Sequence, residues 1–226
     1  MSSPHNVMHR LWRVVALACV AASARAQVPE TLDLSAVGKN PRWRVAGRTA
    51  TQVEIDGRHA LHLDEGPGNG VVWLDGYSFT NGVIEADIKG RSQPVQGSFV
   101  GVAFRVVDGE THDAVYFRPF NFQASDSTRH SHAVQYVSHP RWPWDTLRAA
   151  HPGVYEKAVV PGLDGDQWFH VRIVVRRPTV TVFVNGRTTP CLVVNELSDR
   201  ASGSVGVWVG NMSPGDFANL RVTKTP

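Results

Sequence analysis

The chain has 226 residues, 42% of them hydrophobic and 19% charged, and a formal net charge of +3. This length is enough for one substantial domain with its own core. Three arginines in the first 26 residues account for the net charge, so the rest of the chain is close to neutral. This balance argues against a strongly basic surface that would bind nucleic acid or anionic membranes.

The first 26 residues have the layout of a secretory signal peptide. A basic start precedes a short apolar run over 14–22, and Ala24 and Ala26 form an A-x-A cleavage motif. The apolar run is too short to span a bilayer. We therefore expect a cleaved leader over 1–26 and a secreted or periplasmic protein whose mature chain has no membrane span.

Residues 27–226 are expected to form a single domain. Lipoprotein anchoring at Cys19 is the alternative to cleavage at the A-x-A motif, but Ala16 stands where lipoprotein signals usually have leucine. Cys191 is then the one cysteine of the mature chain, which excludes an intrachain disulfide. A hydrophobic core therefore has to stabilise the fold.

Short runs of β-branched and aromatic residues, separated by Gly, Pro, Asp and Asn, follow one another from about residue 71. In chain order they are VVWL, GVIEADIKG, SFVGVAFRVV, DAVYFR, HAVQYV, WFHVRIVV, TVTVFVNG, GSVGVWVG and FANLRV. Several alternate between apolar and polar residues, as strands with one face on a core do. In GVIEADIKG, Glu85 and Asp87 share the polar face, where a solvated surface is favoured over a catalytic pair.

Two sequence turns predict hairpins between such runs, at Asp56-Gly57 and at Asn185-Gly186. No segment has a helical period of useful length. Nine or more strands over this length predict an all-β fold, a two-sheet antiparallel β-sandwich.

The segment 138–167 interrupts this rhythm with SHPRWPWDTLRAAHPGVYEKAVVPGLDGDQ. Connections this long inside a compact domain are usually functional or disordered, and the aromatic residues here argue against disorder. We therefore predict that the segment helps to form a site.

Taken together, FTNGVIEADIKG, GSFVGVAFR, DAVYFRPFN, HAVQYV, VTVFVNG and GDFANLRV resemble the strands of a concanavalin A-like jelly roll. Over about residues 70–224 the chain is most similar to bacterial secreted 3-keto-disaccharide hydrolase domains, which are loosely grouped with family 16 glycoside hydrolases. The resemblance implies a jelly-roll domain that acts on carbohydrates. Because one fold carries many functions, the activity has to be argued from the site.

DAVYFRPFN supplies the first candidate substrate-binding residues. Alternation sets Phe117 toward the core and Tyr116 and Arg118 on the opposite face. Pro119 ends the strand, so Asn121 follows at its rim. An arginine fork beside an aromatic ring suits a sugar, through hydrogen bonds and stacking. A cross-sheet ion pair for Arg118 and a turn cap for Asn121 are the structural alternatives.

HAVQYV is interpreted as the partner strand of DAVYFR. A glutamine in the middle of a strand needs hydrogen-bond partners or solvent, so Gln135 is a candidate to meet Arg118 at one ligand. The register is open at this point, and Tyr136 could hold that position instead.

The segment 138–167 supplies the remaining candidates. Trp142 and Trp144 flank a proline and predict a rigid stacking platform for a pyranose ring, with a hydrophobic flap as the alternative. Tyr155 and Glu156 lie in a short piece that returns to the sheet. Glu156 is the candidate catalytic acid or base, an exposed ion pair being the alternative, and His139 is the second candidate.

Metal binding is weighed at two places. His130 and His132 form an H-x-H pair, but no cysteine or acid at a tight spacing completes a zinc site. Near the C-terminal edge, GNMSPGDFAN offers oxygen ligands at Asp216 and Asn219, with Asn211 at the start of the same stretch. The resemblance to lectin-like sandwiches implies a structural calcium there, against a turn-stabilising role for these residues.

Three functions remain open from the sequence. The first is an exported carbohydrate-active domain that hydrolyses glycosides or 3-keto-glycosides. The second is a non-catalytic lectin-like carbohydrate-binding module of the same fold. The third is a protein-adhesion domain similar to laminin G domains.

Overall fold

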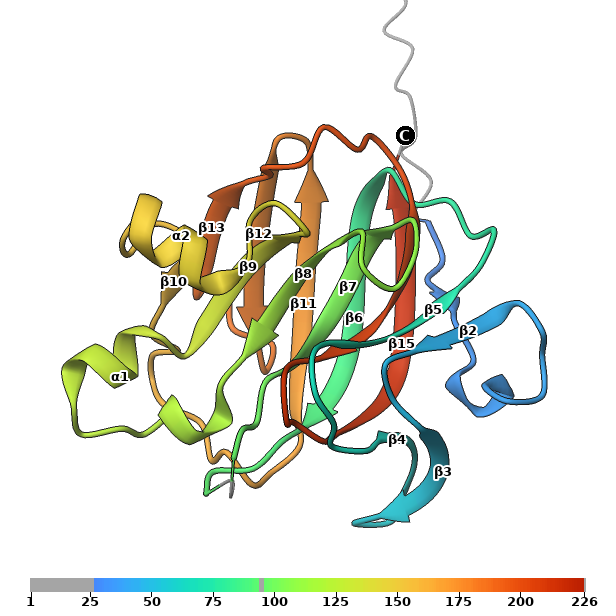
Figure 1. Ribbon diagram of the computed structural model, residues 1–226, viewed down its shortest axis with the longest axis horizontal. Coiled ribbons are helices and arrows are strands. Elements are labelled where there is room, and N and C mark those ends of the chain that lie inside the picture. Colours follow the sequence, from blue (N-terminus) through green and yellow to red (C-terminus); the bar gives the residue numbers. More distant parts are fainter. Residues whose placement is uncertain (1–26, 94–95, 226) are drawn as a thin grey trace, which may run out of the picture.

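A computed structural model describes residues 27–93 and 96–225. The predicted leader and Cys19 lie outside these residues. Two antiparallel sheets pack face to face (Figure 1), which confirms the predicted all-β sandwich. None of the helices in the described ranges is long and apolar enough to cross a membrane.

One sheet has eight strands. Its spatial order is β13 (Leu192–Asn195), β12 (Thr179–Val184), β11 (Phe169–Arg176), β6 (Asn81–Lys89), β15 (Gly215–Thr225), β4 (Arg58–Leu63) and β3 (Ala50–Ile55), with β1 (Glu30–Thr31) paired to β15.

The other sheet has seven strands. Its spatial order is β10 (Glu156–Lys157), β9 (Val134–His139), β8 (His112–Phe117), β7 (Val100–Val106), β14 (Ser204–Val209), β5 (Gly70–Leu74) and β2 (Trp43–Ala46).

Four short helical segments lie between the strands. They are η1 (Leu34–Ala36), η2 (Pro119–Asn121), α1 (Ser127–Ser131) and α2 (Trp144–Ala150). Three of them, η2, α1 and α2, lie along one side of the seven-stranded sheet (Figure 1). The segment 138–167 contains α2, for which the sequence shows no helical period, and the short strand β10, which is the piece predicted to return to the sheet.

The core lies between the sheets and follows the predicted alternation. In β6 every second residue is buried, including Ile84, Ala86 and Ile88. Phe117 of β8 meets Phe169 of β11 across the core, with 5.2 Å between ring centroids. Aromatic pairs at this separation add about 0.5–1.5 kcal/mol beyond the area they bury.

The two sheets differ on their outer faces. In β7, β8 and β14 every residue is buried, whereas β6, β11 and β12 bury only alternate residues. The seven-stranded sheet is thus covered on both faces along its middle strands. The candidate site lies on the outer face of this sheet, among the segments that cover it.

The turn at Asp56-Gly57 is confirmed as a tight hairpin, because Ile55 pairs with Arg58 and both turn residues have positive φ. Asn185-Gly186 also has positive φ at both residues, but β12 and β13 pair only from Val182 and Leu192 onward. A wider loop therefore connects these two strands.

Candidate functional site

One row of residues crosses the outer face of the seven-stranded sheet. Backbone pairing sets Gln135 opposite Tyr116, Tyr116 opposite Gly101, and Gly101 opposite Trp208. Side chains in such a row project to the same face. A Cβ at Gly101 would lie 2.7 Å from the Tyr116 Cβ, so glycine leaves the space in which the Tyr116 and Trp208 rings approach to 4.9 Å.

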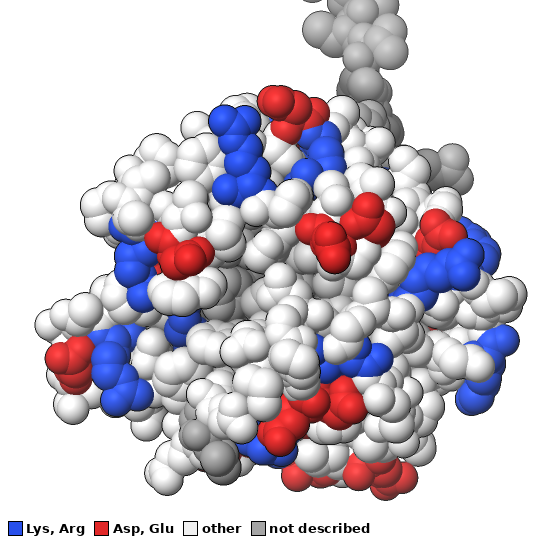
Figure 2. Space-filling model, viewed as in Figure 1, with Lys and Arg blue, Asp and Glu red and all other residues white. Residues whose placement is uncertain are grey.

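Tyr116 and Trp208 of this row line a cavity of about 310 Å³. Much of its wall is aromatic, because Phe99, Phe120 and Trp144 join Tyr116 and Trp208. Figure 2 shows this face of the molecule, hollowed near the α1 and α2 regions, with basic side chains close to the hollow. Aromatic walls with a few convergent polar groups are typical of small-molecule sites and suit a sugar ring.

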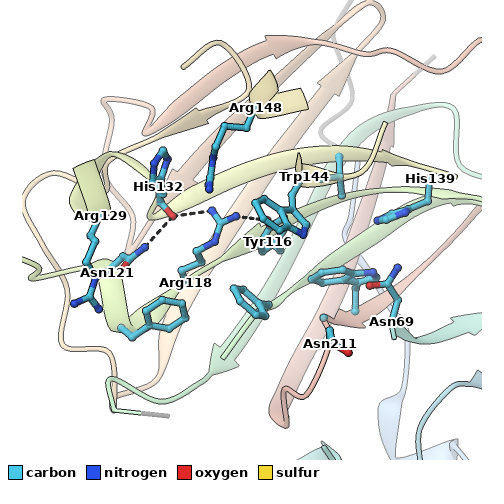
Figure 3. Close-up of a pocket in the computed structure, with 15 residues that line it drawn as sticks. Asn69, Tyr116, Arg118, Asn121, Arg129, His132, His139, Trp144, Arg148 and Asn211 are labelled. Atoms are coloured by element: carbon cyan, nitrogen blue, oxygen red, sulfur yellow. Dashed lines mark hydrogen bonds between the residues drawn. The ribbon is translucent and has the colours of Figure 1, made fainter. Parts of the chain in front are cut away.

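Polar side chains give the cavity two different ends (Figure 3). The cationic end is formed by Arg118, Asn121, Arg129, His132 and Arg148. The neutral end is formed by Asn69, His139 and Asn211. The two ends can therefore bind chemically different parts of one ligand.

Arg118 is the buried cation of the cationic end, with its side chain 6% exposed. Its guanidinium donates to the Gln135 Oε1 at 2.7 Å, to the His132 carbonyl at 2.8 Å and to the Tyr116 hydroxyl. A carboxylate oxygen of Glu156 lies 3.8 Å away. Burial lowers the pKa of Arg118, but an arginine stays charged in proteins. The cavity therefore borders a positive charge that is held mainly by neutral acceptors.

Asn121 lies beside Arg118 and is 4% exposed. Its Nδ2 donates weakly to the His132 carbonyl at 3.4 Å, and its Oδ1 has no partner among the described residues. Buried polar atoms are nearly always hydrogen-bonded. The Asn121 Oδ1 thus lacks the hydrogen bond that a buried amide oxygen normally accepts.

Glu156 lies behind the cationic end and is 3% exposed. Arg148 donates to both carboxylate oxygens, at 3.0 and 2.8 Å. Burial by itself would raise the pKa of Glu156, but the hydrogen bond and charge of Arg148, with the charges of His132 and Arg118, outweigh burial and lower that pKa. Glu156 is therefore an ionised carboxylate, which differs from the acid role considered from the sequence.

Two histidines line the cavity, one at each end. The His132 Nδ1 lies 2.8 Å from Glu156 Oε2, although its N–H direction is not aligned with that oxygen. Burial, together with the charges of Arg148 and Arg118, lowers the pKa of His132 despite the opposing charge of Glu156. Burial also lowers the pKa of His139, whose ring stacks beside Trp208 at 6.4 Å. Both imidazoles are thus neutral near pH 7 and able to accept a proton.

The structure brings together the three residues on which the predicted groove depends, because Arg118 contacts both Gln135 and Glu156. The structure also shows which residue of HAVQYV lies on the face of Arg118, because Tyr116 pairs with Gln135. Gln135 shares the outer face with Tyr116 and accepts hydrogen bonds from Tyr116 and Arg118, whereas Tyr136 points into the interior, where its hydroxyl accepts a hydrogen bond from the Leu197 N–H. Tyr155 packs on Tyr136 at 5.9 Å and belongs to the same interior group.

The fold places the two tryptophans of the predicted stacking platform in different surroundings. Trp144 lines the cavity, is 48% exposed, and has the Arg148 guanidinium over its ring at 4.9 Å. Trp142 instead packs against the core and against His151. The reason is local, since two backbone hydrogen bonds join Trp142 to Ser138 and fold it back on the end of β9.

Asp216 and Asn219, the predicted calcium ligands, lie on β15 of the other sheet. The Asp216 carboxylate contacts His62 Nδ1 at 2.7 Å, and Asn219 donates to Asp87 at 2.7 Å. The two side chains serve separate cross-strand contacts and do not converge on one point. In residues 27–93 and 96–225 no group of three or more His, Cys, Asp and Glu side chains is arranged to hold a metal ion.

Several cavity residues carry little signal in the sequence. Trp208 lies in GSVGVWVG, where alternation places it on one face but does not reveal which strand it joins. In the sequence His132 is recognisable only as part of an H-x-H pair, and Arg148 only as a cation of the segment 138–167 that could pair with Glu156. Their shared position beside Arg118 depends on β9, β10 and α2 meeting at one edge of the sheet.

A family model described as "3-keto-alpha-glucoside-1,2-lyase-like domain" matches residues 36–223. No curated protein matches the chain. Among solved structures, the carbohydrate-binding module CBM66 from Bacillus subtilis is 13% identical, with a TM-score of 0.58 over 80% of this chain and 96% of that chain.

Two other solved structures are similar. A Bacillus subtilis protein of unknown function with a galectin-like fold is 14% identical, with a TM-score of 0.54 over 85% of this chain and 92% of that chain. The exoplasmic/lumenal domain of VIP36, in a form with Ca²⁺ and Man3GlcNAc bound, is 11% identical, with a TM-score of 0.53 over 82% and 85%. At identities this low, the structural similarity shows a shared fold and nothing more specific.

Proposed function

The chain belongs to the 3-keto-alpha-glucoside-1,2-lyase-like domain family, and from this premise we propose that its cavity binds a 3-keto-glucoside and eliminates the group at C1. The domain is carbohydrate-active, and the proposal concerns the reaction. The observation that carries it is that Arg118 and His132 both line one cavity: the buried guanidinium donates to the His132 backbone carbonyl, and the Glu156 Oε2 lies 3.8 Å from the Arg118 Nη1 and 2.8 Å from the His132 Nδ1.

Elimination needs a base and an electrostatic partner for developing charge. The C2 proton of a 3-keto-glucoside is acidified by the neighbouring ketone, so a base can remove it while negative charge moves onto the ketone oxygen. A preorganised cation in a water-poor site stabilises such an oxyanion strongly. Arg118 supplies that cation.

The proton can be transferred by one residue. His132 accepts the C2 proton, the C2–H electron pair forms the enolate, and the enolate then expels the C1 oxygen with the electrons of the C1–O bond. The protonated His132 returns its proton to the departing oxygen. The products are a C1=C2 unsaturated keto-sugar and a free alcohol, so atoms and charge balance without water.

His132 fits the base position better than His139. The base must lie within hydrogen-bond reach of a carbon adjacent to the one whose oxygen binds Arg118. His132 lies at the Arg118 end, because its backbone carbonyl accepts a hydrogen bond from Arg118 and its Nδ1 is 2.8 Å from the Glu156 oxygen that lies 3.8 Å from Arg118. His139 lies four residues beyond Gln135 on β9, or about 13 Å along the strand. We assign His139 to binding the hydroxyls of the sugar at the neutral end.

Glu156 then acts as a positioning residue. The negative charge of its carboxylate, 2.8 Å from the His132 Nδ1, favours the tautomer with the proton on that nitrogen, which leaves Nε2 to accept a proton. A pair of carboxylates flanking the substrate, as in most glycoside hydrolases, does not line this cavity in the described residues. This favours elimination over direct hydrolysis.

A non-catalytic sugar-binding module is the second candidate. The aromatic wall and the unpartnered Asn121 Oδ1 support binding without requiring any reaction. The neighbours of known fold include a carbohydrate-binding module, which supports the same alternative.

The test uses purified protein with 3-keto-α-glucosides, matched unoxidised α-glucosides, and a 3-keto substrate carrying deuterium at C2. We expect alcohol release from the keto substrates alone, an unsaturated keto-sugar by mass spectrometry, and slower release from the deuterated substrate. If the alcohol were released at the same rate from the deuterated substrate, and the sugar product kept its deuterium at C2, the reaction would be hydrolysis. Saturable binding by calorimetry without release would establish the binding-module alternative.

We propose in addition that residues 1–26 direct export and are removed, although these residues lie outside those the structure describes. The support is the basic, apolar and A-x-A order of the sequence. N-terminal sequencing of protein recovered from the periplasm or medium should begin at Gln27. A start at Cys19 bearing lipid would instead establish a lipoprotein.

A further inference from the structure

A second cleft adjoins the cationic end of the cavity. It has a volume of about 420 Å³ and shares two lining residues with the cavity, Phe120 and Arg129. Its other walls are largely polar and include Gln123, Ser125 and Asp164. The two hollows are therefore neighbours along one surface, separated by the side chains that line both.

The boundary between them is suited to a sugar chain. The Phe120 ring is held edge-on against Phe99 at 5.7 Å, which fixes one aromatic face at the passage. Arg129 is exposed on α1, and its guanidinium makes no ion pair within the described part of the chain. Its five N–H donors are thus free to bind hydroxyl oxygens on either side.

A third observation points in the same direction. The unpartnered, buried Asn121 Oδ1 lies at this end of the cavity and adjoins Phe120 in the chain. A hydroxyl group of a sugar unit is the donor that a buried amide oxygen lacks here.

We infer that the substrate is longer than a disaccharide, and that its leaving part passes over Phe120 and Arg129 into the second cleft. This inference rests on the proposed function, which places proton return to the departing oxygen at His132, close to the α1 side of the cavity. The leaving part therefore departs toward Arg129. The mixed polar lining of the second cleft, with one carboxylate at Asp164, suits a neutral, hydroxyl-rich chain.

The test is a length series of 3-keto-α-glucosides in which the leaving part has one, two or three neutral sugar units. We expect kcat/KM to rise by about tenfold from one unit to two, the gain of two or three added hydrogen bonds. R129A and Q123A should each bring the ratio of kcat/KM for the two-unit substrate to kcat/KM for the one-unit substrate toward one. R172A, an arginine on the outer face of the eight-stranded sheet, is the matched control and should keep the ratio of the parent protein.

Calorimetry with the unoxidised oligosaccharides provides an arm that does not depend on turnover. Tighter binding of longer chains, weakened by R129A and not by R172A, supports the second cleft even if the reaction differs from elimination. Equal kcat/KM and equal affinity at all lengths would overturn the inference while leaving the proposed function intact. Failure of every keto substrate to react, with length-dependent binding retained, would overturn the proposed function alone.

Discussion

The outer faces of the two sheets carry similar residue types in different surroundings. On the eight-stranded sheet, the His170 Nδ1 lies 2.8 Å from Asp87, and its Nε2 lies 3.4 Å from Glu85. Arg58 and Asn219 complete the group around Asp87, over a small hollow of about 150 Å³. On the seven-stranded sheet, His132 and Arg118 border a cavity of about 310 Å³ with aromatic walls.

The difference lies in charge compensation and burial. His170 is 39% exposed and contacts two carboxylates, and the hydrogen bond that it donates to Asp87 raises its pKa. His132 is 20% exposed and lies between a carboxylate and two arginines, and burial lowers its pKa. A histidine paired with acids in solvent stabilises a surface, whereas a neutral histidine beside a buried cation can accept a proton.

The largest expected effect comes from removing the proposed base. H132N should lower kcat/KM for 3-keto-glucosides by about 10²–10⁴, the range of general acid–base catalysis. H170N, the matched histidine of the other face, should leave kcat/KM unchanged. Steady-state kinetics of the two variants make the measurement, and equal losses in both would mean that His132 acts only through stability.

The next effect comes from the buried cation. R118M should lower kcat by about 10²–10³, because it removes the group proposed to stabilise the enolate oxygen. R172M on the opposite face should match the parent protein. If R118M raised KM and left kcat unchanged, Arg118 would be a binding residue without a role in the reaction step.

A smaller effect concerns pH. Because His132 must be neutral and its pKa is lowered, kcat/KM should fall only at acid pH, below the usual histidine range near 6.5. R148Q removes a cation that lowers the His132 pKa, so the acid limb should move to higher pH. E156Q removes an anion that raises it, so the limb should move to lower pH.

R148Q and E156Q should therefore shift the acid limb of kcat/KM in opposite directions, although the two residues contact each other. Profiles of kcat/KM between about pH 4.5 and 8 would measure both shifts, with circular dichroism as the check on folding. Shifts in the same direction, or none, would assign the acid limb to a group other than His132.

The smallest effect is on stability. The pKa of His170 is raised in the folded state, so its contact with Asp87 stabilises fully below the unfolded value near 6.5 and is lost as pH rises through the folded value. H170Q should thus be less stable than the parent near pH 5.5 and nearly equal near pH 9. Because the His170 side chain is 39% exposed and its charge is screened by solvent, the loss should stay below about 1 kcal/mol in urea unfolding. H59Q on the same sheet is the control, and an equal deficit at both pH values would contradict the ion pair.

Much of the local structure follows from the sequence. Alternation places Phe117 in the core and Tyr116 on the other face, and the structure has both there. β8 ends at Phe117, and η2 begins at Pro119, because proline offers no N–H to the ladder. These are short-range effects, since side-chain direction in a strand depends only on neighbouring residues.

The sequence by itself determined the strands, the two-sheet class, the tight Asp56-Gly57 hairpin and the face that carries Tyr116 and Arg118. Only the tertiary structure decided that Gln135 and not Tyr136 meets Arg118, that Trp208 lies beside Tyr116, and that Glu156 is engaged by Arg148. A shift of one residue in strand register moves every side chain to the other face, and register depends on pairing between distant segments. The strand phrases are therefore readable along the chain, whereas the site exists only where β8, β9, β10 and β14 are held side by side.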